Sequence, residues 1–89
     1  MLQIITVTVS QADGWHARPA TEFARLVGES GLFVTIGRQG EPAVRGDSVL
    51  SLLTLGARFG EELVVTAASE TEGDPNIATT LIQLAALFA

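Results

Sequence analysis

The segment from Gly14 to Ala20 places a histidine and an arginine at the start of a predicted helix. His16 is the only histidine in the chain, and Arg18 follows it by two residues. The N-terminus of a helix presents unpaired backbone N–H groups and a partial positive charge, so it attracts anions and favours the neutral form of an imidazole. Because a neutral imidazole is a nucleophile toward phosphorus, the segment predicts that His16 accepts a phosphoryl group.

Arg18 and the backbone at the start of the same helix are the groups that would hold this phosphoryl group. A guanidinium binds phosphate through two parallel hydrogen bonds, and the N–H groups of Ala17 and Arg18 would face the added negative charge. Pro19 suits the first turn, and Gly14 lets the preceding loop approach its neighbours closely. A plain helix start with a surface arginine also explains Pro19, but it gives no reason for His16 and Arg18 to occur together.

Ser48 and the short apolar helix that follows it form a second candidate region. Either Asp47 or Ser48 can cap this helix, which ends before Gly56. A helix of about two turns cannot bury all five apolar residues of this segment on one face. Some of them must be exposed, and an exposed apolar patch beside a charged site is a candidate docking surface.

The remaining pattern predicts the elements that position these two regions, in the order β-α-β-β-α-β-α. Apolar alternation and apolar runs predict strands at 2–9, 32–37, 42–45 and 62–68. Helical spacing and capping residues predict helices at 17–29, between Ser48 and Gly56, and from Asp74-Pro75 to Phe88. We expect an α/β two-layer (α+β) sandwich, in which three helices cover one face of a four-stranded, mainly antiparallel sheet.

Composition narrows the possible functions. The 89 residues suffice for one domain, 1–89, and contain no cysteine, which excludes disulfides, zinc–thiolate sites and thiol nucleophiles. The net charge is −5 and the five arginines are scattered, so nucleic-acid binding is not expected. The chain has no lysine, no glycine-rich phosphate loop and no aspartate cluster, and we expect neither a signal peptide nor a membrane span. We expect no cofactor and no metal, and a protein that carries a phosphoryl group without splitting a nucleotide.

The motif G-W-H-A-R-P-A-T resembles the active-site signature of HPr, the histidine-containing phosphocarrier of the sugar phosphotransferase system. Trp15 stands where that family usually has leucine. The segment from Ser48 to Thr54-Leu55-Gly56 is a second match, and the resemblance extends over nearly the whole chain. It implies a cytoplasmic, monomeric carrier rather than an enzyme. Enzyme I would phosphorylate His16 at Nδ1, Arg18 would stabilise the phosphoryl group, and a IIA domain of a sugar permease would receive it.

The resemblance also implies roles for the second region. Val49, Leu50 and Leu53 match positions that contact Enzyme I and permease domains. Ser48 matches a serine that an ATP-dependent kinase phosphorylates in many relatives, although Asp47 stands where lysine is frequent and would oppose an added phosphate. A regulatory interaction protein and a carrier of a nitrogen, fructose or dihydroxyacetone branch remain alternatives. Two aromatic residues lie near these regions. Trp15 could shield the site, enlarge a partner contact or fold over the helix start, and Phe59 is expected to pack at its turn.

Overall fold

The strands form where β-branched and other apolar residues alternate or cluster, and they join into one sheet. The computed structural model describes residues 1–89, and its elements follow the predicted order. The strands are β1 (Leu2–Thr8), β2 (Phe33–Gly37), β3 (Val44–Arg45) and β4 (Glu62–Ala68). The helices are α1 (Ala17–Ser30), α2 (Val49–Thr54) and α3 (Pro75–Ala86). The predicted order and the α/β two-layer class are confirmed.

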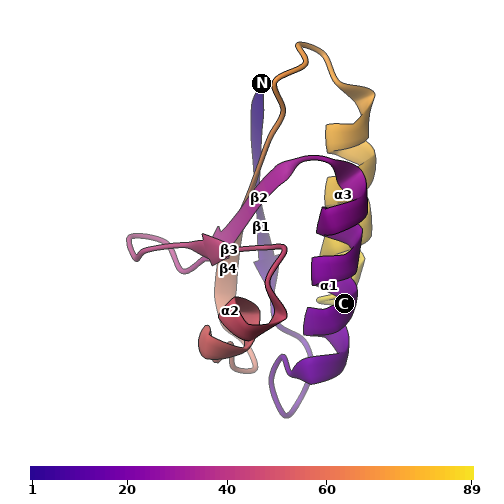
Figure 1. Ribbon diagram of the computed structural model, residues 1–89. Helices are drawn as coiled ribbons and strands as arrows, with labels where there is room; N and C mark the ends of the chain where they lie inside the picture. The colour runs from indigo at the N-terminus through magenta and orange to yellow at the C-terminus, as the bar shows by residue number, and fades with distance from the viewer.

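The sheet has the strand order β1-β4-β2-β3, and every neighbouring pair is antiparallel. Figure 1 shows α1 and α3 side by side along one face of this sheet, with α2 near the end of α1 where that helix begins. α2 packs against α1 and β3. No helix of the structure has the length and apolar character that a membrane crossing requires.

Two boundaries differ from the sequence prediction by two residues, and three others, the end of β1, the start of β2 and the end of α1, differ by one. The third strand begins at Val44 rather than at Pro42, because a proline has no N–H for the ladder and here lies exposed in the preceding turn. The last helix ends at Ala86 instead of continuing to Phe88. Phe88 leaves the helix and enters the core, where it is only 2% exposed.

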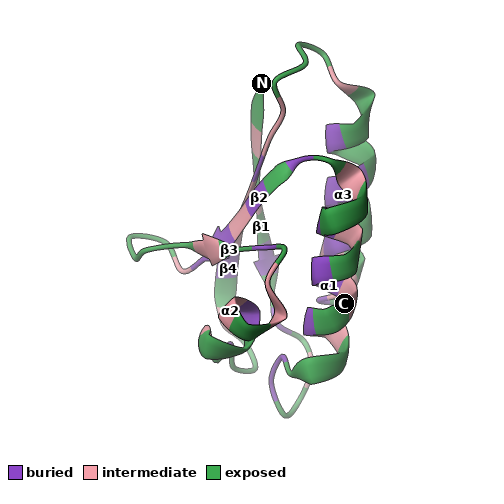
Figure 2. Ribbon diagram, in the orientation of Figure 1, coloured by how far each residue is buried: buried purple, intermediate pink, exposed green.

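The core lies between the sheet and the helices, as the buried segments in Figure 2 show. Strand register brings Val7 opposite Leu63 and Ile36 opposite Val65, and all four side chains are buried. α1 contributes the apolar face that its spacing predicted, namely Ala20, Phe23, Ala24 and Val27. The other face of the sheet carries exposed apolar side chains, including those of Leu2, Ile4 and Phe33.

The helix ends follow the local sequence. Gly31 has a φ of 74° and closes α1 in the left-handed conformation that glycine adopts without strain. The Asp74 side chain accepts a hydrogen bond from the Asn76 N–H at 2.9 Å, and Pro75 occupies the first position of α3. The end of α1 and the start of α3 are thus set by residues next to them in the sequence.

Candidate phosphorylation site

The loop before α1 is attached to the C-terminal end of α3 by side-chain hydrogen bonds. Gln11 Nε2 and Trp15 Nε1 both donate to the Leu87 carbonyl oxygen, at 2.8 and 3.3 Å. Ser10 Oγ donates to the Phe88 carbonyl oxygen at 2.6 Å. The last carbonyl groups of a helix have no partners within the helix, so these donors satisfy acceptors that would otherwise need water. The loop thus has a fixed point of attachment before the first helix begins.

The Trp15 ring reinforces this attachment from inside the core. It stacks on Phe88 with ring centroids 4.7 Å apart, and it meets Phe23 edge-on with centroids 5.5 Å apart. Only 6% of Trp15 is exposed. Of the three roles considered for this residue, packing over the helix start is confirmed. A ring this deeply buried has little surface to offer a partner, so an enlarged partner contact is wrong, whereas shielding of the site stays a prediction.

Gly14 brings the same loop against the segment before β4. Its φ is +86°, and a Cβ at this position would lie 2.9 Å from the Ala57 carbonyl oxygen. The Trp15 N–H donates to that oxygen at 3.0 Å. A side chain at position 14 would therefore be strained by its backbone angle and would also collide with the hydrogen-bond acceptor. The close approach predicted for Gly14 is confirmed.

His16 lies at the boundary between this anchored loop and α1. Its backbone is extended, with φ −125° and ψ −156°, and its carbonyl oxygen accepts the Ala20 N–H at 3.1 Å. The imidazole makes no capping hydrogen bond, and 57% of the side chain is exposed. Its Nε2 atom lies 3.8 Å from Oδ1 of Asp13. The ring is thus accessible to another protein at the N-terminus of the helix.

The first turn of α1 offers two backbone donors beside this ring. The first hydrogen bond of the helix is donated by the Ala20 N–H, so the N–H groups of Ala17 and Arg18 have no partner within the helix. The third residue of the helix, Pro19, has no N–H and therefore adds no further unpaired donor to this turn. An anion near His16 would meet the positive end of the helix dipole together with these two N–H groups.

His16 and Arg18 line one open groove of about 890 Å³ between the start of α1 and the end of α3. Gln11 and Leu87, which hold the loop to α3, line it as well. Three other arginines are ion-paired to carboxylates, namely Arg25, Arg38 and Arg45. Arg18 has no such partner, so its guanidinium is available to an anion in the groove.

Comparison with known proteins identifies the family of this arrangement. Residues 4–89 match the family described as "PTS HPr component phosphorylation site". The chain belongs to the HPr family. It is 45% identical over 67 residues to the phosphocarrier protein HPr of Streptomyces coelicolor, covering 75% of this chain and 70% of that protein. Over 70 residues it is 30% identical to the HPr of Pseudomonas aeruginosa, covering 79% of this chain and 78% of that one.

Solved structures of HPr proteins share the fold. The HPr of Bacillus anthracis superposes with a TM-score of 0.81 at 23% identity, covering 99% of this chain and 98% of that one. A structure of HPr-C-His from Thermoanaerobacter tengcongensis gives a TM-score of 0.76 at 19% identity, covering 97% and 94% of the two chains. The predicted HPr-like sandwich is therefore confirmed for this member of the phosphocarrier family.

α2 divides its apolar residues between the core and the surface of this HPr-family chain, as its length requires. Leu52 is 1% exposed, whereas Leu50 and Leu53 are 74% and 41% exposed. Val49 is half-buried and packs against the core. The predicted exposure of part of this helix is confirmed. The docking role of Val49, Leu50 and Leu53 stays a prediction, and the two leucines offer most of the accessible apolar surface.

Ser48 serves as the N-cap of α2. Its Oγ accepts the Ser51 N–H at 3.2 Å, and the residue is half-buried. Asp47 forms a two-armed ion pair with Arg45, and this hydrogen bonding lowers the pKa of the Asp47 carboxyl. The capping interpretation is confirmed. Phosphorylation of Ser48 stays a prediction.

Two residues differ from the sequence analysis. Phe59 was expected to pack at its turn, but 64% of it is exposed, so that expectation is wrong. The turn is closed by the Glu61 N–H, which donates to the Arg58 carbonyl oxygen at 3.0 Å, and it is joined to the segment after β1 by the Gly60 N–H, which donates to the Val9 carbonyl oxygen at 2.8 Å. Asp13, which lies close to the imidazole of His16, was not predicted as a site residue. Its position three residues before His16 was the only available signal.

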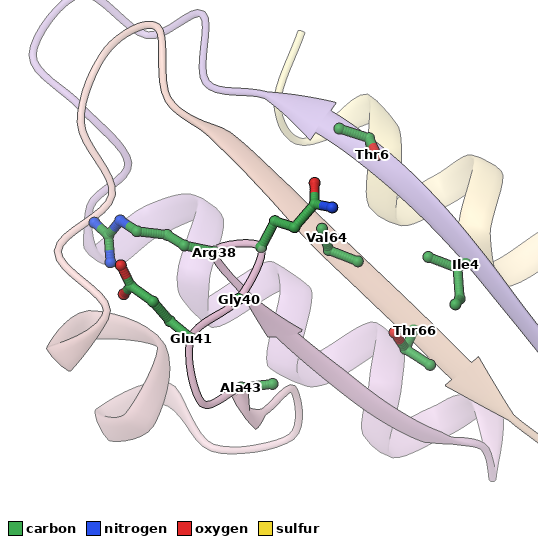
Figure 3. A pocket seen from close by; sticks show the side chains of 10 residues that line it. Ile4, Thr6, Arg38, Gly40, Glu41, Ala43, Val64 and Thr66 are labelled. Carbon is green, nitrogen blue, oxygen red and sulfur yellow. The ribbon is translucent and has the colours of Figure 1, made fainter.

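A second hollow, of about 400 Å³, lies on the outer face of the sheet beside the turn between β2 and β3. Figure 3 shows Ile4, Thr6, Val64 and Thr66 along its strand side. Its one cationic side chain, Arg38, is already held by Glu61 at 2.6 and 2.9 Å. This hollow therefore lacks the free cation that the His16 groove has.

The carboxylate of Glu61 connects two loops on that side of the molecule. It accepts both hydrogen bonds from Arg38 and a further one from the Arg58 N–H at 2.7 Å. These bonds lower the pKa of Glu61 to about 2, and those from the Arg38 guanidinium have the largest effect. No three histidine, aspartate or glutamate side chains gather in an arrangement that could hold a metal ion.

Proposed function

We propose that this HPr-family chain carries a phosphoryl group on His16, which it accepts from phosphorylated Enzyme I and donates to IIA domains of sugar permeases. One observation carries the proposal: an exposed imidazole shares an open groove with an unpaired guanidinium at a helix N-terminus. Membership of the phosphocarrier family supports it. We further propose that the chain acts in the cytoplasm as a monomer and has no catalytic turnover of its own.

The chemistry proposed for His16 is an in-line transfer. The Nδ1 lone pair forms a bond to phosphorus while the bond between phosphorus and the donor breaks, and the donor keeps the electron pair. The phosphoryl oxygens then lie against the N–H groups of Ala17 and Arg18 and the Arg18 guanidinium. Donation to the next protein reverses these steps. Positioning and charge stabilisation suffice for such a transfer, and partner proteins complete the site.

The proposed docking surface consists of Leu50 and Leu53, with Val49 at its edge. Both leucines are exposed on a helix that packs against α1, whose first residues carry the site. An apolar surface of this kind fits partners that must approach, transfer a group and leave. The surface is uncharged, so it is compatible with more than one partner.

The test is phosphorylation from phosphoenolpyruvate with catalytic Enzyme I. We expect one acid-labile, alkali-stable phosphate per chain, absent in His16→Ala. Arg18→Ala should slow phosphorylation while the unfolding midpoint hardly changes, because an exposed and unpaired charge contributes little stability. Arg25→Ala is the matched control, since this arginine lies on the same helix but pairs with Glu22 and Glu29. Labelling that persists in His16→Ala would refute the assignment.

A further inference from the structure

Asp13 is the acidic side chain closest to the imidazole of His16. Its Oδ1 lies 3.8 Å from Nε2, within ion-pair distance, and 84% of its side chain is exposed. Arg18 lines the groove on the helix side of His16, and Glu22, farther along α1, is bonded to Arg25. The carboxylate that faces the ring is therefore that of Asp13, and it faces one particular nitrogen.

The backbone holds Asp13 and His16 in this relation. The Gly14 N–H donates to the Gln11 carbonyl oxygen at 3.0 Å, which closes a turn with Asp13 at its third position. Gly14 and Trp15, which separate the two exposed residues, are both buried and packed or bonded against Ala57 and Phe88. The two side chains thus project from the ends of a short anchored segment, so their proximity follows from the fold.

We propose that Asp13 is a positioning residue that keeps the neutral imidazole of His16 protonated on Nε2. This inference rests on the proposed function of His16. A carboxylate beside one ring nitrogen favours the tautomer with the proton on that nitrogen. The lone pair then lies on Nδ1, which is the nitrogen that the proposed transfer uses as nucleophile. Asp13 would therefore select which nitrogen reacts.

Asp13 also bears on the charge that develops during transfer. As Nδ1 bonds to phosphorus, the ring becomes more positive, while the proton stays on Nε2 and the donor retains the electron pair of the broken bond. The carboxylate is positioned on the Nε2 side and the Arg18 guanidinium is available to the phosphoryl oxygens. Unit charges about 4 Å apart in water attract each other weakly, and stabilising the transition state by that attraction raises the rate about fivefold. We therefore expect Asp13 to raise the phosphorylation rate about fivefold.

The test compares Asp13→Asn and Asp13→Glu with Glu70→Gln. Glu70 is exposed in the loop between β4 and α3, so its replacement makes the same change in net charge away from the site. With ¹⁵N-labelled histidine, NMR at a pH where the imidazole is neutral reports the tautomer directly. We expect the Nε2–H fraction to fall in Asp13→Asn, to be retained in Asp13→Glu, and to match the wild type in Glu70→Gln.

The rate of phosphorylation by Enzyme I should fall about fivefold in Asp13→Asn and recover in Asp13→Glu. An unchanged tautomer in Asp13→Asn overturns the proposal, and so does an unchanged or faster rate. A purely structural role would alter the rate without moving the tautomer. If wild-type protein were not phosphorylated at His16, the proposed function would fail, and the tautomer measurement would still decide the role of Asp13.

Discussion

Replacing Trp15 by leucine tests whether the loop that carries His16 is held by the core. The substitution keeps an apolar side chain of the type usual in the family, but it removes the ring that stacks on Phe88 and meets Phe23. It also removes the Nε1 donor to the Leu87 carbonyl oxygen. That oxygen still accepts a hydrogen bond from Gln11 Nε2 at 2.8 Å, so it is not left without a partner.

The loss of stability can be worked out from these contacts. Aromatic pairs contribute about 0.5–1.5 kcal/mol each beyond their buried area, and the ring atoms not replaced by leucine add roughly 0.8 kcal/mol for each methylene equivalent. The indole hydrogen bond is at the low end of the usual range of about 0.5–1.5 kcal/mol, because Gln11 keeps the acceptor satisfied. We expect Trp15→Leu to lower the free energy of unfolding by about 3 kcal/mol. For a chain of 89 residues this corresponds to a fall in Tm of roughly 12–24 °C.

The measurement is urea unfolding followed by far-UV circular dichroism, because Trp15 is the only tryptophan and its fluorescence is lost in the variant. Phe59→Leu is the matched control. It also replaces an aromatic ring by leucine, but at a residue that is 64% exposed, so the change should stay within about 0.5 kcal/mol. A double-mutant cycle of Trp15→Leu with Phe88→Leu should give a coupling of about 1 kcal/mol.

The phosphorylation rate of Trp15→Leu below its unfolding transition should stay close to that of the wild type. The contacts of Gly14 with Ala57, which also direct the chain into α1, do not involve the indole. A stability loss below about 1 kcal/mol, or one equal to that of Phe59→Leu, would contradict the anchoring role of the ring.

Two further predictions concern the rest of the molecule. The hydrogen bonds from Arg38 and, second, from the Arg58 N–H lower the pKa of Glu61 from 4.5 to about 2, so the stabilisation from this carboxylate is present above pH 4.5 and is lost as the pH falls toward 2. Urea unfolding of wild type and Glu61→Gln should therefore show a stability difference that shrinks over this interval, and a constant difference would contradict the bonding of this carboxylate. Leu50→Ser should raise the KM for phosphorylation by Enzyme I about tenfold, because one interface anchor is lost. Phe33→Ser removes a similarly exposed apolar side chain beyond the opposite end of α1 and should leave this KM unchanged. Equal effects of the two variants would argue against a docking role for α2.

Local patterns predicted most of the fold because each one has a local physical cause. The spacing of Ala20, Phe23, Ala24 and Val27 defines a helix face whatever it packs against, and all four are buried. Asp74-Pro75 starts a helix through bonds made within a few residues. The place of His16 and Arg18 at a helix N-terminus could be predicted for the same reason, since the adjacent sequence sets where the helix begins.

The positions of Trp15, Phe59 and Asp13 could not be predicted, because each depends on contacts with distant parts of the chain. Trp15 is buried only because α3 ends beneath it and supplies Leu87 and Phe88, more than 70 residues later. Phe59 is left outside because a backbone bond from Gly60 to the distant Val9 already holds its turn. Asp13 gains its place beside His16 from the burial of the two residues between them.

A residue that transfers a group between proteins has to be exposed, yet it must also be held in position, and these two requirements conflict because exposed side chains have few contacts. For the function proposed for His16, the neighbours of the histidine resolve this conflict. His16 itself is exposed, while Gly14 and Trp15 before it and Ala20 after it are buried. The contacts that fix the backbone on both sides of His16 therefore belong to the core, and the ring itself can remain exposed. It follows that substitutions at Trp15 should act on stability, whereas substitutions at Asp13 and Arg18 should act on transfer.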